Sequence, residues 1–202
     1  MRKANEPPIC TIVAGPNGTG KTTLASTYLP NRKNFINADE IASTLPESAG
    51  RDIRAAKSFF GKVNEFTERR ESFAIESTLS GRGYLKKISQ LLSDGWRVEL
   101  YYLWVPSIDV SINRVAERVR HGGHNIPAKI IARRYPRSVH NFIYYYAPLC
   151  NLTVCINNST KKPNFIFIQR DGGAIETIDK ESYHLLKQVA ENDRGRSKKQ
   201  SQ

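Results

Sequence analysis

The 202-residue sequence predicts an α/β fold in which a parallel five-stranded sheet carries helices on both faces. Two observations favour this class. Short apolar runs typical of buried strands alternate along the chain with segments of helical periodicity. A glycine-rich turn also joins the first of these strands to the first helix. The chain is long enough to bury one core and shows no repeat or interdomain linker, so we expect a single domain over residues 1–192.

The strands are apolar runs that end at polar or glycine-rich segments. In chain order, we expect them within residues 9–14, 34–39, 72–78, 96–105 and 152–157. The later segment 164–178 has strand character on both sides of Asp171, Gly172 and Gly173, which favour a tight turn. A C-terminal β-hairpin is therefore expected in addition to the five parallel strands.

The helices are recognised by apolar residues that recur three or four positions apart. We expect them after the glycine-rich turn, over residues 51–71, 83–95 and 107–119, from residue 127 onward, and over residues 180–190. Gly95 lies where a glycine often ends a helix, and Pro127 suits a first helical turn. Pro136 is expected to kink or split its helix, because proline lacks the amide hydrogen.

The net charge of +12 favours anionic partners, and it is unevenly distributed. Residues 114–137 contain seven Lys or Arg residues against one acid, Glu117, within a segment of helical periodicity. Residues 193–202 contain four Lys or Arg residues against Asp193 and have no apolar residue. We expect the first segment to be folded and the second to be a disordered basic tail.

The cysteine content and hydropathy predict a cytoplasmic protein. Cys10, Cys150 and Cys155 are few, odd in number and set in apolar segments, which favours buried thiols in a reducing compartment. No apolar run is long enough to cross a membrane. The N-terminus is followed at once by polar residues and prolines, unlike a secretory signal.

The segment GPNGTGKT matches the phosphate-binding pattern G-x-x-x-x-G-K-[ST] in full and lies between a strand and a helix. Its backbone amides and the helix N-terminus favour an anion. Lys21 is expected to reach the β- and γ-phosphates of ATP, and the Thr22 hydroxyl to ligate Mg²⁺. The residues expected to bind the nucleotide are Gly15, Pro16, Asn17, Gly18, Thr19, Gly20, Lys21, Thr22 and Thr23.

Two acids follow neighbouring strands at the edge of the sheet where ligands bind. Asp39 follows the second strand and can accept a proton from an acceptor hydroxyl during phosphoryl transfer; the alternative is a helix cap. Glu76 ends the third strand and can hold the water shell of Mg²⁺ or the acceptor. Thr78 and Ser80 follow it and can hydrogen-bond the acceptor.

The ordered set GPNGTGKTT, NADEIA, AIESTLSGRG and RVAERVRHGGHNIPAKIIARRY resembles the zeta-toxin family of P-loop kinases. The resemblance spans roughly residues 9–180 and is closer to a small branch often labelled predicted ABC-type ATPases. It implies a P-loop kinase-like fold and phosphorylation of a sugar hydroxyl of UDP-N-acetylglucosamine by ATP–Mg²⁺. It also implies a toxin that a small helical antitoxin holds inactive.

Residue roles follow from the same resemblance. Asp39 would be the general base, and Glu76 and Thr78 would hold the acceptor sugar. The family has an arginine two residues after that threonine, where this chain has Ser80, with Arg82 following. The resemblance further implies two catalytic arginines after the fourth strand. The residues that match these two positions or flank them are Arg114, Arg118, Arg120, His124, Arg133 and Arg134, of which we expect Arg118 and Arg134 to be catalytic.

A lid over residues 118–134 is the favoured interpretation of this basic segment. Gly122 and Gly123 form a hinge between two helices, and basic side chains flank it. A metal site through His121 and His124 would need a third ligand, and neither a cysteine nor a further acid lies nearby.

A nucleic-acid surface with stacking tyrosines remains an alternative to the lid. The function predicted for the whole chain is therefore an ATP-dependent small-molecule kinase. The two alternatives are a nucleic-acid-directed phosphotransferase and an ATP-binding regulatory module with little turnover.

Overall fold

The computed structural model describes residues 6–28, 34–46, 48–123 and 125–199. Its strands form one sheet in the order β2-β3-β1-β4-β5-β6-β7. The first five strands in this order pair in parallel, as expected, while β6 and β7 pair antiparallel. The strands are β1 Ile9–Ala14, β2 Phe35–Asn37, β3 Phe73–Ser77, β4 Arg97–Trp104, β5 Leu152–Asn157, β6 Asn164–Arg170 and β7 Ile175–Thr177.

The sheet therefore has seven strands rather than five. The expected C-terminal hairpin is present, but it extends the sheet: β6 pairs with β5 from Asn157 opposite Asn164 to Leu152 opposite Arg170. A strand edge left open at β5 would expose unpaired backbone groups, which the hairpin covers. The hairpin was predicted from its turn residues. These residues carry no information about which strand of the sheet the hairpin pairs with.

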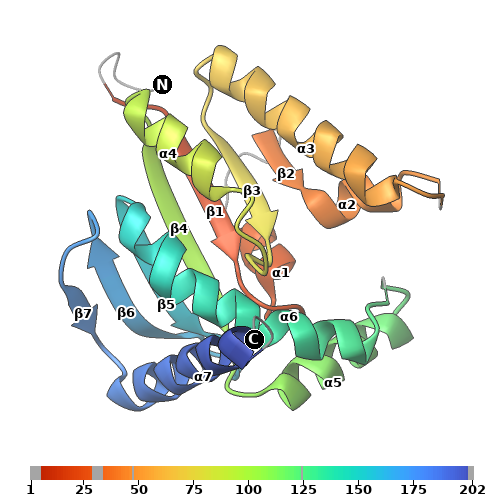
Figure 1. Ribbon diagram of the computed structural model, residues 1–202, viewed down its shortest axis with the longest axis vertical. Coiled ribbons are helices and arrows are strands. Elements are labelled where there is room, and N and C mark those ends of the chain that lie inside the picture. Colours follow the sequence, from red (N-terminus) through yellow and green to blue (C-terminus); the bar gives the residue numbers. More distant parts are fainter. Residues whose placement is uncertain (1–5, 29–33, 47, 124, 200–202) are drawn as a thin grey trace.

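Helices lie on both faces of the sheet, as predicted, but unequally. Side chains of α3, α4, α6 and α7 pack with the sheet in one large apolar core, and Figure 1 shows α4 and α6 lying across the strands. On the opposite face, α1 packs Ala25 and Leu24 against Val13 and Leu103. The helices are α1 Lys21–Tyr28, α2 Ala38–Ser43, α3 Arg51–Glu68, α4 Leu85–Ser93, α5 Ile108–Arg120, α6 Ala128–Asn141 and α7 Lys180–Lys199.

Helix α6 continues through Pro136, so the helix is not split there. Its neighbours Tyr135 and Val139 are buried in the core, and this packing offsets the backbone hydrogen bond that Pro136 cannot make. After Asn141 the chain continues as a π-helical segment, η2 (Phe142–Tyr146), and a 3-10 turn, η3 (Ala147–Leu149). In η2, Phe142 is fully buried and stacks on Tyr102, with 3.7 Å between ring centroids.

Helix α7 reaches Lys199, although residues 193–202 were expected to be disordered. The first residue of that segment, Asp193, is buried. Leu186 and Ala190 anchor the helix in the core, and the residues that follow are compatible with helix propagation from an existing nucleus. Residues 200–202 lie outside the described part of the chain.

Cys10, Cys150 and Cys155 are buried free thiols, as predicted. Burial raises the pKa of Cys150 to about 12, and it also raises the pKa values of Cys10 and Cys155. These thiols are therefore protonated near neutral pH, which leaves them inert as nucleophiles. Among the described residues, no helix combines the length and apolarity needed to span a bilayer.

Candidate active site

The phosphate loop connects β1 to α1, and two of its glycines are required by close packing. Gly15 has φ +142°, and a Cβ there would lie 2.1 Å from the Leu103 carbonyl oxygen. Gly18 has φ +76°, and a Cβ there would lie 2.5 Å from the carbonyl oxygen of Ser111 on α5. Any side chain at either position would displace the loop from β4 or α5.

Within the loop, two side chains turn back to one carbonyl. The Thr19 hydroxyl donates to the Pro16 oxygen at 2.9 Å, and the Lys21 ammonium donates to the same oxygen at 3.0 Å. Lys21 is only 6% exposed. Its charge is therefore already inside the concave loop where the sequence predicts the phosphates of ATP.

Glu76 lies beside the start of α1. Thr22 Oγ1 donates to Glu76 Oε1 and Oε2 at 3.1 and 3.0 Å, and Asn37 Nδ2 donates to Oε2 at 3.2 Å. Parallel pairing of β2 with β3 places Asn37 opposite Glu76, which brings this amide to the buried carboxylate. Asn37 was not among the predicted site residues, although its place at the end of β2, just before Asp39, was a usable signal.

A polar cavity of about 200 Å³ opens next to this group. The Thr78 and Ser80 hydroxyls lie 3.0 Å apart at its wall. Arg134 reaches the same cavity from α6, so the structure brings it together with Lys21. The lining residues are Lys21, Asn37, Ala38, Glu76, Ser77, Thr78, Ser80, Gly81, Tyr84 and Arg134.

The wall of this cavity is held in place by hydrogen bonds from α6 and η2. Asn141 Nδ2 donates to the Leu79 carbonyl at 3.0 Å, and the Ser138 hydroxyl donates to the Thr78 carbonyl. The Tyr146 hydroxyl donates to the Gly81 carbonyl at 2.8 Å, and burial raises its pKa to about 12. Tyr146 therefore stays neutral near pH 7 and serves as a donor.

Asp39 is the second residue of α2 and directly follows Ala38, which lines the cavity. The side chain of Asp39 lies outside the described part of the structure, so its role as general base stays a prediction. The same applies to His124, which falls between described residues 123 and 125.

The other predicted basic residues are not lining residues of this cavity. Arg118 is exposed in the last turn of α5, and Arg133 is exposed on α6. Arg120 pairs with Glu117 on the surface. Arg82 lies over the Tyr145 ring, 3.9 Å from its centroid, and donates to Asn141 at 3.3 Å. Their predicted roles would require movement of the segment between α5 and α6, or a substrate larger than the cavity.

The residues of the predicted lid lie at the junction of two helices. Helix α5 ends at Arg120, Gly122 has φ +82°, and α6 begins at Ala128. The Gly123 amide donates to the Arg118 carbonyl at 2.9 Å and closes the end of α5. Val115, Ile126 and Ile131 join the two helices in a small core that is separate from the main one.

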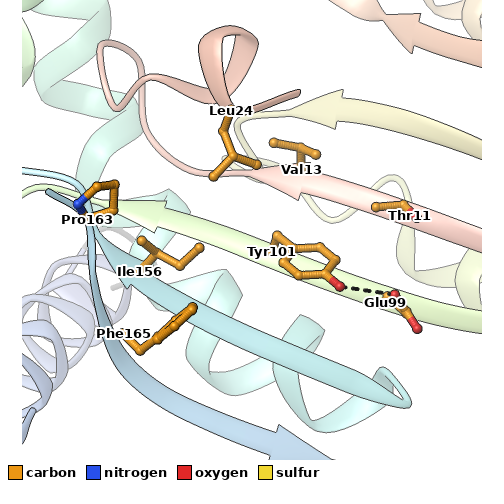
Figure 2. A pocket seen from close by; sticks show the side chains of 8 residues that line it. All are labelled: Thr11, Val13, Leu24, Glu99, Tyr101, Ile156, Pro163 and Phe165. Atoms are coloured by element: carbon orange, nitrogen blue, oxygen red, sulfur yellow. Dashed lines mark hydrogen bonds between the residues drawn. The ribbon is translucent and has the colours of Figure 1, made fainter. Parts of the chain in front are cut away.

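A second hollow, of about 440 Å³, lies on the sheet face that carries α1 (Figure 2). Ile156, Phe165 and Leu24 give it a largely apolar lining. Figure 2 shows its polar pair, in which the Tyr101 hydroxyl donates to Glu99 at 3.2 Å. It offers a carboxylate rather than cations, so the polar cavity beside the phosphate loop is the candidate active site.

Comparison with known proteins agrees with this geometry. A family model described as zeta toxin matches residues 1–148, which include the phosphate loop, the polar cavity and helices α5 and α6. An uncharacterized protein of Haemophilus influenzae is 31% identical over 123 residues, which are 60% of this chain and 88% of that protein.

Solved structures share the fold at low identity. The complex of AvrRxo1-ORF1 with AvrRxo1-ORF2 in the presence of sulphate ions is similar with a TM-score of 0.70 and 17% identity. The match covers 93% of this chain but only 64% of the longer AvrRxo1 chain. The PezAT toxin–antitoxin system of Streptococcus pneumoniae matches with a TM-score of 0.58 and 15% identity, over 95% of this chain and 89% of that one.

Proposed function

Because this chain belongs to the zeta-toxin family, we propose that it is an ATP-dependent phosphotransferase that moves the γ-phosphate of ATP to a hydroxyl group of a small molecule. One observation carries the proposal. Lys21 of the phosphate loop lines the same polar cavity as Thr78, Ser80 and Arg134. The γ-phosphate of ATP and the acceptor hydroxyl would therefore meet between the cationic side chains of Lys21 and Arg134. Phosphoryl transfer needs this arrangement, because it depends on positioning and on stabilising negative charge.

The phosphate loop binds the β- and γ-phosphates through its amides and Lys21. In this structure the Lys21 ammonium donates to the Pro16 carbonyl, and we expect it to exchange this contact for a phosphate oxygen. The Thr22 hydroxyl and the Glu76 carboxylate are oxygen groups within 3.1 Å of each other, which is the donor chemistry that Mg²⁺ prefers. When bound there, Mg²⁺ would neutralise charge on the phosphates.

The chemical step requires a base, an in-line acceptor and cations. Asp39, at the start of α2 beside the cavity wall, takes the proton from the acceptor hydroxyl. The acceptor oxygen forms a bond to the γ-phosphorus as the bond from that phosphorus to the bridging oxygen breaks, and ADP leaves. Arg134 and Lys21 hold the oxygens of the transferring group while their charge redistributes.

The acceptor that we propose is a nucleotide sugar of the UDP-N-acetylglucosamine type. The polar cavity of about 200 Å³ suits one sugar ring, with the Thr78 and Ser80 hydroxyls as hydrogen-bond partners. Arg82, outside the cavity beside Gly81, would meet the charged nucleotide portion, in place of the arginine that the family has at position 80.

We further propose that a small antitoxin controls this activity in the cytoplasm. Support comes from the solved relatives, since the PezAT structure is described as a toxin–antitoxin system and AvrRxo1-ORF1 was crystallised with a partner protein.

A nucleic-acid-directed phosphotransferase is the second candidate, favoured by the net charge of +12 and by the basic segment 114–137. In that case phosphate would appear on RNA or DNA ends, and binding would fall steeply with salt. A regulatory module would instead bind ATP without transferring phosphate to any acceptor.

One experiment separates these functions. The protein is incubated with ATP–Mg²⁺ and either a pool of metabolites or RNA, and products heavier by one HPO₃ group are sought by mass spectrometry. A phosphorylated nucleotide sugar supports the proposal, and Lys21→Ala protein serves as the inactive control. Phosphate on RNA alone, or ATP binding with no phosphorylated product, would refute it.

A further inference from the structure

Arg114 on α5 does not point toward the candidate phosphate site. Its Nη1 donates to the Asn158 carbonyl at 2.6 Å, and its Nη2 donates to the Ser159 carbonyl at 2.8 Å. From the sequence, Arg114 was one of the basic residues at or beside the positions of the two expected catalytic arginines. The structure instead uses its guanidinium fork to hold the two residues that follow β5, a geometry that lysine cannot reproduce.

Asn158 in turn holds the phosphate loop. Its Nδ2 donates to the Thr19 carbonyl at 2.8 Å, and its backbone amide donates to the Trp104 carbonyl at 2.8 Å. The contact is close, because a Cβ on Gly20 would lie 2.6 Å from Asn158 Nδ2. Asn158 is therefore fixed to β4 through its backbone and to the loop through its side chain.

Helix α5 also touches the loop directly, one turn before Arg114. The carbonyl of the fully buried Ser111 lies where a side chain on Gly18 would have to go. The loop is thus held at Gly18 by α5 itself and at Thr19 by Asn158, which α5 holds through Arg114.

We propose that Arg114 and Asn158 are positioning residues that set the anion-binding conformation of the phosphate loop. The physical reason lies in the planar trans peptide between Thr19 and Gly20, where C=O and N–H point in opposite directions. Because Asn158 fixes the Thr19 carbonyl on the outer side, the Gly20 amide is directed to the inner side, where phosphate binds. Arg114 makes that orientation depend on α5, the helix that leads into the predicted lid.

The consequence for catalysis rests on the proposed function, but the loop conformation can be tested without it. The variants are Arg114→Ala, Asn158→Ala and the double variant, with Arg114→Lys as the milder change. Asn113→Ala on the exposed side of α5 and Lys161→Ala in the exposed loop after β5 are matched controls. Circular dichroism and melting temperature establish that each variant is folded.

Hydrogen exchange of residues 15–22 in nucleotide-free protein is the first measurement. We expect faster exchange in both single variants and the double variant, and no change in the controls. Affinity for ATP–Mg²⁺ by calorimetry is the second. Asn158→Ala loses a hydrogen bond to the loop backbone, and Arg114→Ala loses the contacts that hold Asn158. Each single variant should therefore bind about tenfold more weakly. The double variant should also bind about tenfold more weakly, since both residues act through one contact.

Three results would overturn the proposal. A hundredfold loss in the double variant, or wild-type affinity in Asn158→Ala beside weak binding in Arg114→Ala, would show that Arg114 contacts the nucleotide independently. Unchanged exchange of residues 15–22 in all variants would show that the loop keeps its conformation without the two residues. If wild-type protein binds ATP but transfers no phosphate, the proposed function fails and these measurements still decide the role of Arg114 and Asn158.

Discussion

Glu76 is a buried carboxylate that accepts hydrogen bonds from Thr22 and Asn37, side chains far from it in sequence. A buried charge is tolerated when such donors surround it. The Thr22 hydroxyl therefore has a partner before any nucleotide arrives, as does Lys21 through Pro16. At the scale of single residues, binding of ATP–Mg²⁺ means replacing contacts that the protein already makes.

Replacement of Lys21 by alanine should abolish phosphate transfer with the fold retained. Lys21 supplies a cation to the phosphates, and among its contacts with the protein is a hydrogen bond to the Pro16 carbonyl. Phosphotransfer and melting temperature are measured together, with Lys62→Ala on the exposed side of α3 as a control. Undiminished transfer by a folded Lys21→Ala protein would refute the assignment of the phosphate site.

Asp39→Asn tests the general base. Asparagine keeps the size of the side chain and its ability to cap a helix, but it does not accept the proton. Transfer should fall by about a hundredfold or more while ATP affinity stays nearly unchanged. The comparison is Asp109→Asn in the first turn of α5, which should retain activity. If transfer by Asp39→Asn stays within a factor of a few, Asp39 acts as a cap.

At the scale of elements, α5, the following turn and α6 form one unit. Their apolar side chains share a small core. The two arginines that were predicted to be catalytic differ in their position relative to the cavity. Arg134 lines the cavity, while Arg118 lies at the exposed end of α5. A catalytic role for Arg118 therefore depends on closure of this unit, and a role for Arg134 does not.

Arg134→Ala should lower kcat and kcat/KM together, by on the order of a thousandfold, because it removes a cation from the transition state. Arg118→Ala should lower kcat as well if the unit closes, and Arg118→Lys should rescue it poorly. Kinetics at several salt concentrations are compared with Arg137→Ala, an exposed arginine of α6. Equal, salt-sensitive losses of affinity in all three alanine variants, with kcat unchanged, would instead indicate a polyanion-binding surface.

Most elements could be predicted from the sequence because their signals are local. Apolar periodicity identified α3, α4 and α5, and Gly95, with φ +74°, ends α4 as expected. The sequence could not show whether Pro136 would split its helix, because a local preference alone does not decide this. Tertiary burial of Tyr135 and Val139 decides the course of α6, and a short window of sequence does not contain that information.

At the scale of the whole molecule, the core is concentrated on the sheet face covered by α3, α4, α6 and α7. Phe142 of η2 lies near its centre, stacked on Tyr102 and next to Phe167, with 3.7 and 5.8 Å between ring centroids. The same segment supports the wall of the cavity through Tyr146. The π-helical turn therefore ties the stability of the core to the shape of the candidate site.

Phe142→Ala should destabilise the protein by about 3–5 kcal/mol, because it leaves a cavity in a packed core. Phe165→Ala, whose side chain is 53% exposed, should change stability by less than about 1 kcal/mol. Urea unfolding of both variants checks this expectation. Similar stabilities for the two variants would show that η2 is not a central part of the core.

The phosphate loop, Glu76, Thr78, Ser80 and Arg134 could be placed from the sequence because they belong to motifs with defined spacing. Asn158 could not, since its contact with Thr19 exists only after distant parts of the chain have come together. Asn37 was marked by its place at the end of β2, but its contact with Glu76 depends on the pairing of β2 with β3. The pairing of the C-terminal hairpin with β5 could not be predicted from the sequence for the same reason. In each case the sequence does not show which distant residues come into contact in the folded protein.

The hydrogen bond from Asn158 to Thr19 spans 139 residues, and this separation has a consequence during translation. The phosphate loop is synthesised before β4, α5 and Asn158, which hold it. A nascent chain that ends before residue 158 lacks the amide that orients the loop. The growing polypeptide should therefore gain affinity for nucleotide only after residue 158 has left the ribosome.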